Sequence, residues 1–216
     1  MRTVSLVIAM LFFWILQVQA QGPRSELFGG YSLFSAEGAQ GTSPGLVGVT
    51  GAVGRSNLNG FGTSLSAGGK HWGAFFEFAY HQGRPEVLVS DGSRTIPVRE
   101  DAKVFQFGGG PRISFRTQTA TVFFHGSVGS LIGRFSRPSI TQRGITITTE
   151  GSASTANYTV GGGGGLDFNV SNRISIRAVQ FDYIGEIGSE SIFGGGIDVA
   201  NHFRFQSGIV FKFGVQ

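Results

Sequence analysis

The chain has 216 residues, of which 36 are glycine and 21 are phenylalanine, and its length suits a single domain. It has no cysteine, which excludes a disulfide framework, and its glycine content does not suit a helical bundle. Only 14% of the residues are charged, and the net charge of +4 is scattered without a run of Lys or Arg, which argues against a nucleic-acid partner.

The first twenty residues have the features of a secretory signal peptide. Arg2 supplies the positive charge, Val4–Leu16 the apolar run, and Val18-Gln19-Ala20 a small-residue cleavage site. The apolar run is shorter than the roughly 20 residues of a membrane-spanning helix, so cleavage is favoured over an N-terminal anchor. We therefore expect residues 1–20 to be a signal peptide and residues 21–216 to form the mature domain.

The first three predicted strands are Leu27–Ser35, Leu58–Gly68 and Trp72–Gln82. The first is apolar on both faces, and the second alternates apolar with small polar residues. Successive side chains of a strand point to opposite sides, so one face of the third strand is entirely apolar or aromatic. That face carries Trp72, Ala74, Phe76, Phe78 and Tyr80. Aromatic residues at both ends of an outward face are typical of a membrane barrel.

The next three predicted strands are Lys103–Arg116, Thr121–Phe135 and Ser154–Val170. Pro111 removes a backbone donor from the first of these, so we expect a bulge or a local break there. The last contains the five glycines Gly161–Gly165. Glycine weakens an isolated strand, but in a narrow barrel it makes room for a bulky inward side chain or a neighbouring Phe.

The last two predicted strands are Arg173–Ile184 and Asn201–Gly214. In the former, the alternation changes phase after Ala178, which indicates a bulge or emergence from the bilayer. The latter has an aromatic face and a charged face and exceeds the roughly 9–11 residues that a tilted strand needs to cross a bilayer. This pattern is typical of the closing strand of an outer-membrane barrel.

The connections between these strands alternate between long and short. The long ones are Ala36–Asn57, Gly83–Glu100, Ser136–Ala153 and Gly185–Ala200, and short turns lie between them. Membrane barrels have an even number of strands, short periplasmic turns and long outer loops. The sequence therefore predicts an all-β fold, an eight-stranded antiparallel up-and-down transmembrane barrel. In the second long connection, Pro85 and Pro97 argue against a central strand.

Six charged side chains fall on the predicted lumen face. They are Glu77, Arg112, Asp167, Arg177, Arg204 and Lys212. Side chains can just fill an eight-stranded barrel, and an unpaired buried ion costs several kcal/mol. We therefore expect a structural polar network, with Glu77–Arg112 and Asp167–Arg177 as pairs on neighbouring strands. The alternative is a narrow ion path.

His125 and Ser127 lie two residues apart on one strand face, a spacing similar to that of the His/Ser pair in the outer-membrane lipid A deacylases. Val128 stands where that family has Asn, and the sequence assigns no orienting carboxylate. We expect the pair to face the lumen, and we predict neither a catalytic residue nor an enzyme. The glycine run lacks a following Lys-Ser/Thr and opens no helix, and the histidines lack ligand spacing, so no cofactor or metal is expected.

Four motifs carry a family resemblance that extends from Leu27 to Gly214. They are Phe28-Gly29-Gly30-Tyr31, the run from Phe107-Gly108 to Pro111-Arg112, Gly163–Asp167, and Gly208-Ile209-Val210-Phe211-Lys212-Phe213. The chain resembles the OmpA-like family of small eight-stranded outer membrane β-barrels. The resemblance implies residence in the cell outer membrane, contact with its lipids and insertion by the barrel-assembly machinery. Phe213 is followed by Gly-Val-Gln, whereas the family often ends in an aromatic residue that marks the chain for insertion.

These observations predict a structural or surface-interaction role, in which the long loops meet extracellular partners. A narrow channel for ions or small solutes is the first alternative, although the large inward residues Phe75, Phe123 and Arg112 argue for a plug. A soluble lipocalin-like barrel that binds a ligand is the second. In such a barrel the apolar face would point inward. The long strands and the aromatic belt of Trp72–Gln82 argue against this alternative.

Overall fold

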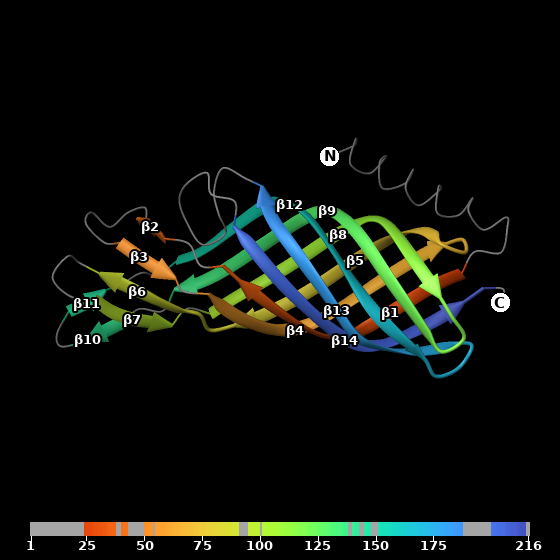
Figure 1. The fold of residues 1–216 in the computed structure, drawn as a ribbon. Helices are drawn as coiled ribbons and strands as arrows, with labels where there is room; N and C mark the ends of the chain where they lie inside the picture. The colour runs from red at the N-terminus through yellow and green to blue at the C-terminus, as the bar shows by residue number, and fades with distance from the viewer. Residues whose placement is uncertain are drawn as a thin grey trace.

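Eight long strands close into an antiparallel barrel (Figure 1). They are β1 (Arg24–Ala36), β4 (Ser56–Gly68), β5 (Trp72–Gly83), β8 (Asp101–Arg116), β9 (Ala120–Arg137), β12 (Gly151–Asn169), β13 (Ile174–Ile187) and β14 (Asn201–Phe213). The computed structural model describes residues 24–37, 40–42, 50–53, 55–90, 95–99, 101–137, 140–142, 145–147, 151–187 and 200–214. The predicted signal peptide lies outside these residues.

The order of strands around the barrel follows the chain. Each strand pairs with the preceding and following barrel strand, and β14 closes on β1 with a register that runs from Ser25–Phe213 to Ser35–Phe203. This confirms the predicted up-and-down topology. Closure leaves no free sheet edge, so the ladder pairs the backbone groups within the barrel, as a bilayer requires.

Parts of three long connections also form strands. β2 (Gln40–Thr42), β3 (Thr50–Val53), β6 (Glu86–Ser90) and β7 (Thr95–Arg99) make a four-stranded sheet in the order β2-β3-β6-β7, and β10 (Ile140–Gln142) pairs with β11 (Ile145–Ile147). These short strands gather beyond one end of the barrel (Figure 1). Pro97 lies on β7, which is an edge strand of the four-stranded sheet, a place where proline is tolerated.

β13 contains a β-bulge at Ala178. Its register against β12 shifts between Leu166 and Asp167, and its register against β14 shifts between Arg177 and Gln180. Because of the extra residue, Arg177 and Gln180 are both buried in the lumen although they are three residues apart. The phase change in the sequence is therefore a bulge.

The predicted irregularity at Pro111 takes the form of a local break. The pairing of β8 with β9 runs to Gly109–Val128 and resumes at Arg112–His125 in the same register. Because the register is unchanged, the strand holds no extra residue here. Pro111 lies on the outward face, and its pairing with Ala74 of β5 continues.

The glycine run of β12 leaves space for inward side chains, as predicted. A Cβ atom at Gly165 would collide with the ring of Phe123, and one at Gly163 would collide with the carboxylate of Asp182. Both of these neighbours are buried in the lumen. The absence of side chains at these glycines therefore leaves room in the lumen for the side chains of other strands.

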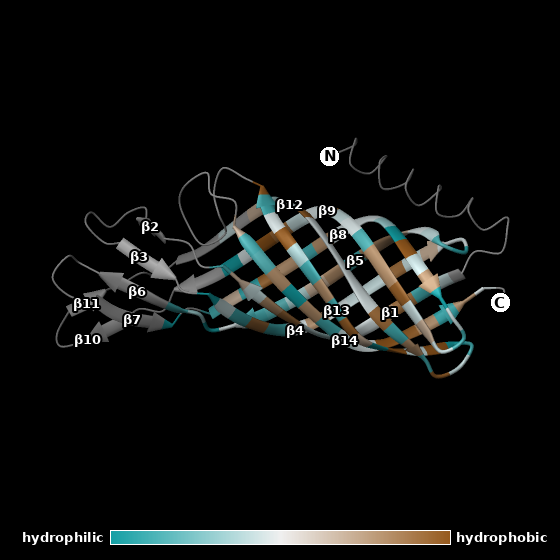
Figure 2. Ribbon diagram, viewed as in Figure 1, coloured by the Kyte–Doolittle hydropathy of each residue, from teal (hydrophilic) through white to brown (hydrophobic). Residues whose placement is uncertain are grey.

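The outer surface of the barrel is apolar on all eight strands. Figure 2 shows hydrophobic and hydrophilic residues interspersed along the barrel strands. The large apolar residues on the outward face are exposed, among them Leu27, Phe61, Phe76, Phe107, Phe124, Phe168, Ile176 and Phe211. Among the described residues, no helix is long and apolar enough to cross a membrane.

The first prediction concerns the space beside Gly165. Gly165→Val forces a side chain against Phe123, and overpacking of this kind costs about 1–3 kcal/mol. We expect a lower urea midpoint in detergent, followed by tryptophan fluorescence. Gly29→Val is the matched control, because a Cβ there meets nothing within 4 Å on the outward face. An equal loss of stability in both variants would contradict the prediction.

Candidate functional site in the barrel lumen

Charged and polar side chains fill the lumen. The charged ones that are at most 5% exposed are Glu26, Glu77, Asp167, Asp182, Glu186, Arg112, Arg177 and Arg204. They come from six strands, because inward positions alternate with lipid-facing ones along each strand. Burial of ions at this depth is tolerated only where each has a partner of opposite charge and further hydrogen bonds.

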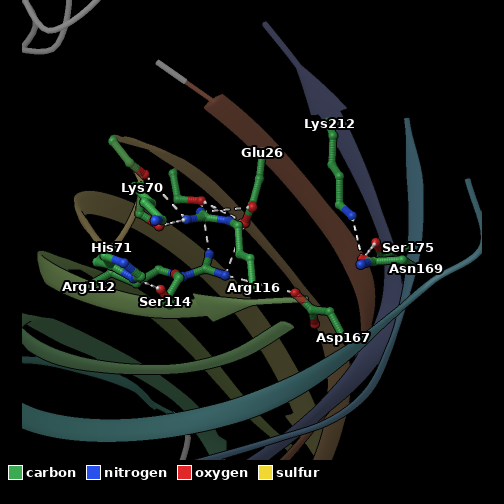
Figure 3. A network of polar contacts seen from close by, with 12 residues as sticks. Glu26, Lys70, His71, Arg112, Ser114, Arg116, Asp167, Asn169, Ser175 and Lys212 are labelled. Atoms are coloured by element: carbon green, nitrogen blue, oxygen red, sulfur yellow. Dashed lines mark hydrogen bonds and ion pairs between the residues drawn. The ribbon is translucent and has the colours of Figure 1, made fainter. Parts of the chain in front are cut away.

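One set of these ions, the turn-side cluster, lies toward the short turns and comprises Glu26, Arg112, Arg116 and Asp167, which Figure 3 labels, together with Arg177, which pairs with Asp167. Glu26 accepts a hydrogen bond from Arg116 at 3.2 Å and forms an ion pair with Arg112, whose Nη2 lies 3.0 Å from its other carboxylate oxygen. Arg177 holds Asp167 in a bidentate pair, with Nε–Oδ1 of 2.8 Å and Nη2–Oδ2 of 3.2 Å. Arg112 also lies 3.8 Å from Asp167, so the two halves of the cluster are linked.

A second set, the central cluster, is organised by Arg204 and comprises Arg204, Glu77, Asp182, Gln106 and His125. The guanidinium contacts Glu77 at 2.5 Å, Asp182 at 2.8 and 2.9 Å, and Gln106 at 3.0 Å. Nε2 of His125 lies 3.0 Å from the other carboxylate oxygen of Asp182. These partners occupy β5, β8, β9 and β13, so the cluster reaches across the lumen from β14.

Gln180 and Phe123 bind the two clusters into one packed unit. The oxygen of Gln180 accepts from Arg177 at 2.7 Å, and its amide nitrogen donates to Asp182 at 2.9 Å. The ring of Phe123 lies against Arg112 and Arg177, with centroid distances of 4.1 and 4.4 Å. Cation–π contacts of this kind gain strength when the cation is removed from water.

The loop side of the lumen is closed by apolar side chains, here called the apolar cap. Its members are 0–2% exposed and are Phe34, Ala36, Leu58, Ala102, Val104, Leu131 and Ile184. Two histidines flank it: the rings of His81 and His202 lie 5.1 and 5.2 Å from the ring of Phe34. His81 pairs with Ser32 at 2.7 Å, and His202 with Glu186 at 3.0 Å. The lumen therefore holds ion-pair clusters in its central and turn-side parts, and toward the loops it holds apolar groups beside the buried His202–Glu186 pair.

Solved structures share this architecture. Ail, the attachment invasion locus protein of Yersinia pestis, aligns with 88% of this chain and 99% of its own, at 16% identity and a TM-score of 0.53. The outer membrane protein OprG from Pseudomonas aeruginosa covers 89% and 96%, at 12% identity and 0.57. Neisserial surface protein A covers 88% and 97%, at 10% identity and 0.56. No family model and no curated protein matches the sequence.

The chain has the fold of the small outer-membrane barrels. At these identities the likeness concerns the fold alone, and it agrees with the resemblance seen in the sequence. For an outer-membrane barrel of this size, an apolar exterior is the surface that meets lipid, and the polar residues belong inside.

The lumen residues predicted from the sequence divide into two groups in this barrel. Glu77, Arg112, Asp167, Arg177 and Arg204 are buried, and Asp167 and Arg177 contact each other as expected. Lys212 is half-buried and donates to Asn169 at 2.6 Å. Their joint role as a structural network stays a prediction at this point.

The expected pair between Glu77 and Arg112 is wrong. Glu77 contacts Arg204, and Arg112 contacts Glu26. The register explains the error, because Glu77 lies opposite Gly108, four residues along β8 from Arg112. Adjacent strands alone do not bring two side chains together; they must also lie at the same height.

Sequence reasoning missed Glu26, Asp182 and Gln180. Glu26 stands one residue before the predicted start of its strand, and the other two lie beyond the bulge of β13, where the alternation changes phase. Continuing the alternation past Ala178 with one residue inserted would have placed Gln180 and Asp182 in the lumen.

No hydrogen bond joins His125 and Ser127 in the described part of the barrel. The carboxylate that the sequence could not assign is Asp182, which pairs with His125 inside the lumen. Ser127 lies beside Gly161 of β12. No group of three or more His, Asp or Glu among the described residues is arranged to hold a metal ion.

The second prediction tests which ions are coupled. In a double-mutant cycle of Glu77→Gln with Arg204→Met, we expect a coupling free energy above about 1 kcal/mol, because the two contact each other in the lumen. The cycle of Glu77→Gln with Arg112→Met is the control and should give a clearly smaller value. Urea unfolding in detergent measures both. A coupling to Arg112 as large as that to Arg204 would contradict the observed pairing.

Proposed function

We propose that the protein is a structural barrel of the cell outer membrane, with a closed lumen, that presents its long connections to the exterior. The observation that carries this proposal is the filling of the lumen by the apolar cap and the two ion-pair clusters beneath it. The six lumen charges predicted from the sequence are then structural rather than solute-binding, because five of them lie in the ion-pair clusters and Lys212 is held by Asn169.

A channel is the less favoured function because an ion would have to cross the apolar cap. Phe34, Leu58 and Leu131 in this layer are fully buried, and a charge passing their side chains would lose water without gaining a polar partner from them. Below the cap, the guanidinium of Arg204 occupies the middle of the lumen and is held by two carboxylates. Opening a path would require breaking these pairs.

The soluble lipocalin-like alternative requires the opposite distribution of side chains. A lipocalin-like interior would be apolar, whereas here Arg177, Arg204 and Asp167 are 1% exposed. The exterior would be polar, whereas Trp72 and Phe124 are 68% and 56% exposed. The distribution supports a barrel whose outside faces lipid.

We also propose the partners that follow from this location. Outer-membrane lipids contact the apolar exterior, and the barrel-assembly machinery inserts the chain after residues 1–20 have directed its export. Ail was solved in complex with the heparin analogue sucrose octasulfate. On that likeness we propose that the long connections meet extracellular partners. No enzymatic role is proposed, because His125 is held by Asp182 in the lumen and shares no hydrogen bond with Ser127 within the described chain.

The third prediction is that the folded protein does not conduct. Refolded protein should migrate differently on a gel before and after boiling, which shows a closed barrel. In planar bilayers at about 100 mV, it should give no stable conductance steps, because the apolar cap and the central cluster block the lumen.

The control for conductance is a matched pair of truncations. Leu58→Ala removes bulk from the apolar cap, and Leu65→Ala removes the same bulk from the lipid-facing side of the same strand. The change on the lipid side, Leu65→Ala, should not affect conductance. Stable steps from the wild-type barrel would show that the lumen is a pore and would refute the closed-lumen proposal.

A further inference from the structure

The apolar belt on the outside of the barrel ends at one level on several neighbouring strands. The register places Phe61, Tyr80, Phe105 and Ile132 in a row across β4, β5, β8 and β9. The next outward row toward the long connections is polar and consists of Asn59, Gln82, Lys103, Arg134 and Ser154. All five of these side chains are exposed.

The height of the belt places this polar row at a membrane surface. On β8, the outward apolar run extends from Phe105 to Phe115. At about 3.4 Å per residue and a tilt of about 40°, its height along the barrel axis is about 26 Å, close to the roughly 25 Å apolar band of outer-membrane barrels. Lys103 is the next outward residue beyond this run, at the level of lipid head groups on the loop side.

Lys103 and Arg134 form an unusual pair in this row. They lie directly opposite each other on β8 and β9, and like charges in that position repel. Among the described residues, no carboxylate lies within 4 Å of either. The outward carboxylate nearest along β8, Asp101, is already paired with Arg84 at 2.8 Å. The strand pairing thus concentrates positive charge that the described part of the protein does not neutralise.

Neighbouring groups hold this pair in place and add a donor. The guanidinium of Arg134 lies over the ring of Phe105 at 5.8 Å. Gln82, opposite Lys103, accepts the hydroxyl of Tyr80 at 3.1 Å through its oxygen. Its amide nitrogen is therefore a further donor beside the two cations.

We propose that Lys103 and Arg134 bind a phosphate group of a lipid in the outer leaflet. A guanidinium matches phosphate oxygens in a bidentate manner, and an ammonium adds a point charge, so one phosphate between them turns repulsion into attraction. The acyl chains of the same lipid would lie on the aromatic row directly below. This inference rests on the proposed function in one respect, which is that the long connections face the exterior.

The fourth prediction tests this site with lipid A as the probe. Folded protein in nanodiscs is titrated with bisphosphorylated lipid A and, separately, with the same lipid after removal of both phosphates. We expect the wild type to prefer the phosphorylated lipid by about tenfold or more, less so at high salt, and K103Q/R134Q to lose most of that preference. Equal binding of the two lipids by the wild type would refute the proposal.

The matched control is K70Q/R173Q, which removes the same charge from exposed positions at the opposite end of the barrel. It should keep the preference of the wild type. An equal loss in both double variants would show that net charge, and not this pair, attracts the lipid, and would overturn the site. Inorganic phosphate is the competing probe: displacement of the lipid by an equal concentration of it would assign the site to free phosphate instead.

The result of the lipid-binding test can be distinguished from the result of the conductance test of the proposed function. Protein that shifts on boiling and does not conduct, but shows no phosphate preference, would refute the lipid site and leave the closed structural barrel intact. A wild-type protein that conducts, but whose preference for the phosphorylated lipid is lost in K103Q/R134Q, would refute the closed barrel and support the lipid site.

Discussion

The centre of this barrel depends on one buried guanidinium. Arg204 is 1% exposed and contacts Glu77, Asp182 and Gln106. Its partners on β5 and β8 are not neighbours of its own strand β14, so these bonds connect opposite walls of the lumen. The backbone ladder holds each strand only to the next one. Cross-lumen pairs of this kind fix the cross-section of the barrel, which the ladder alone leaves free to flatten.

The remaining buried carboxylates around this tie each face a basic side chain. Glu26 and Asp167 each face a guanidinium in the turn-side cluster, while Glu186 faces His202 next to the apolar cap. The volume of the lumen is also matched to its contents: β12 has glycines, which lack a side chain, at the positions where Phe123 and Asp182 need room. In a lumen this narrow, charge and volume must both be satisfied at every level, which is why few positions inside are independent.

Strand order, loop rhythm and the outward face were predictable from the sequence, because each depends on local alternation. Even the bulge at Ala178 and the break at Pro111 left local signals. The ion pairs were not predictable in the same way. A contact such as Glu77–Arg204 joins residues far apart in the chain through the tilt and stagger of the whole barrel, and no local pattern specifies that stagger. The pair Asp167–Arg177 was predicted correctly because a short turn joins the two strands that carry these residues.

The pairing of β3 with β6 joins strands from the first two long connections in one sheet. β2 and β3 come from one connection, β6 and β7 from the next, and only their joint sheet aligns all four. A peptide from either connection would therefore contain only two of the four strands, and an antibody raised against it would not be selected for the arrangement of the complete sheet. The pair of β10 and β11, by contrast, is contained in one connection, so a single peptide would include both of its strands.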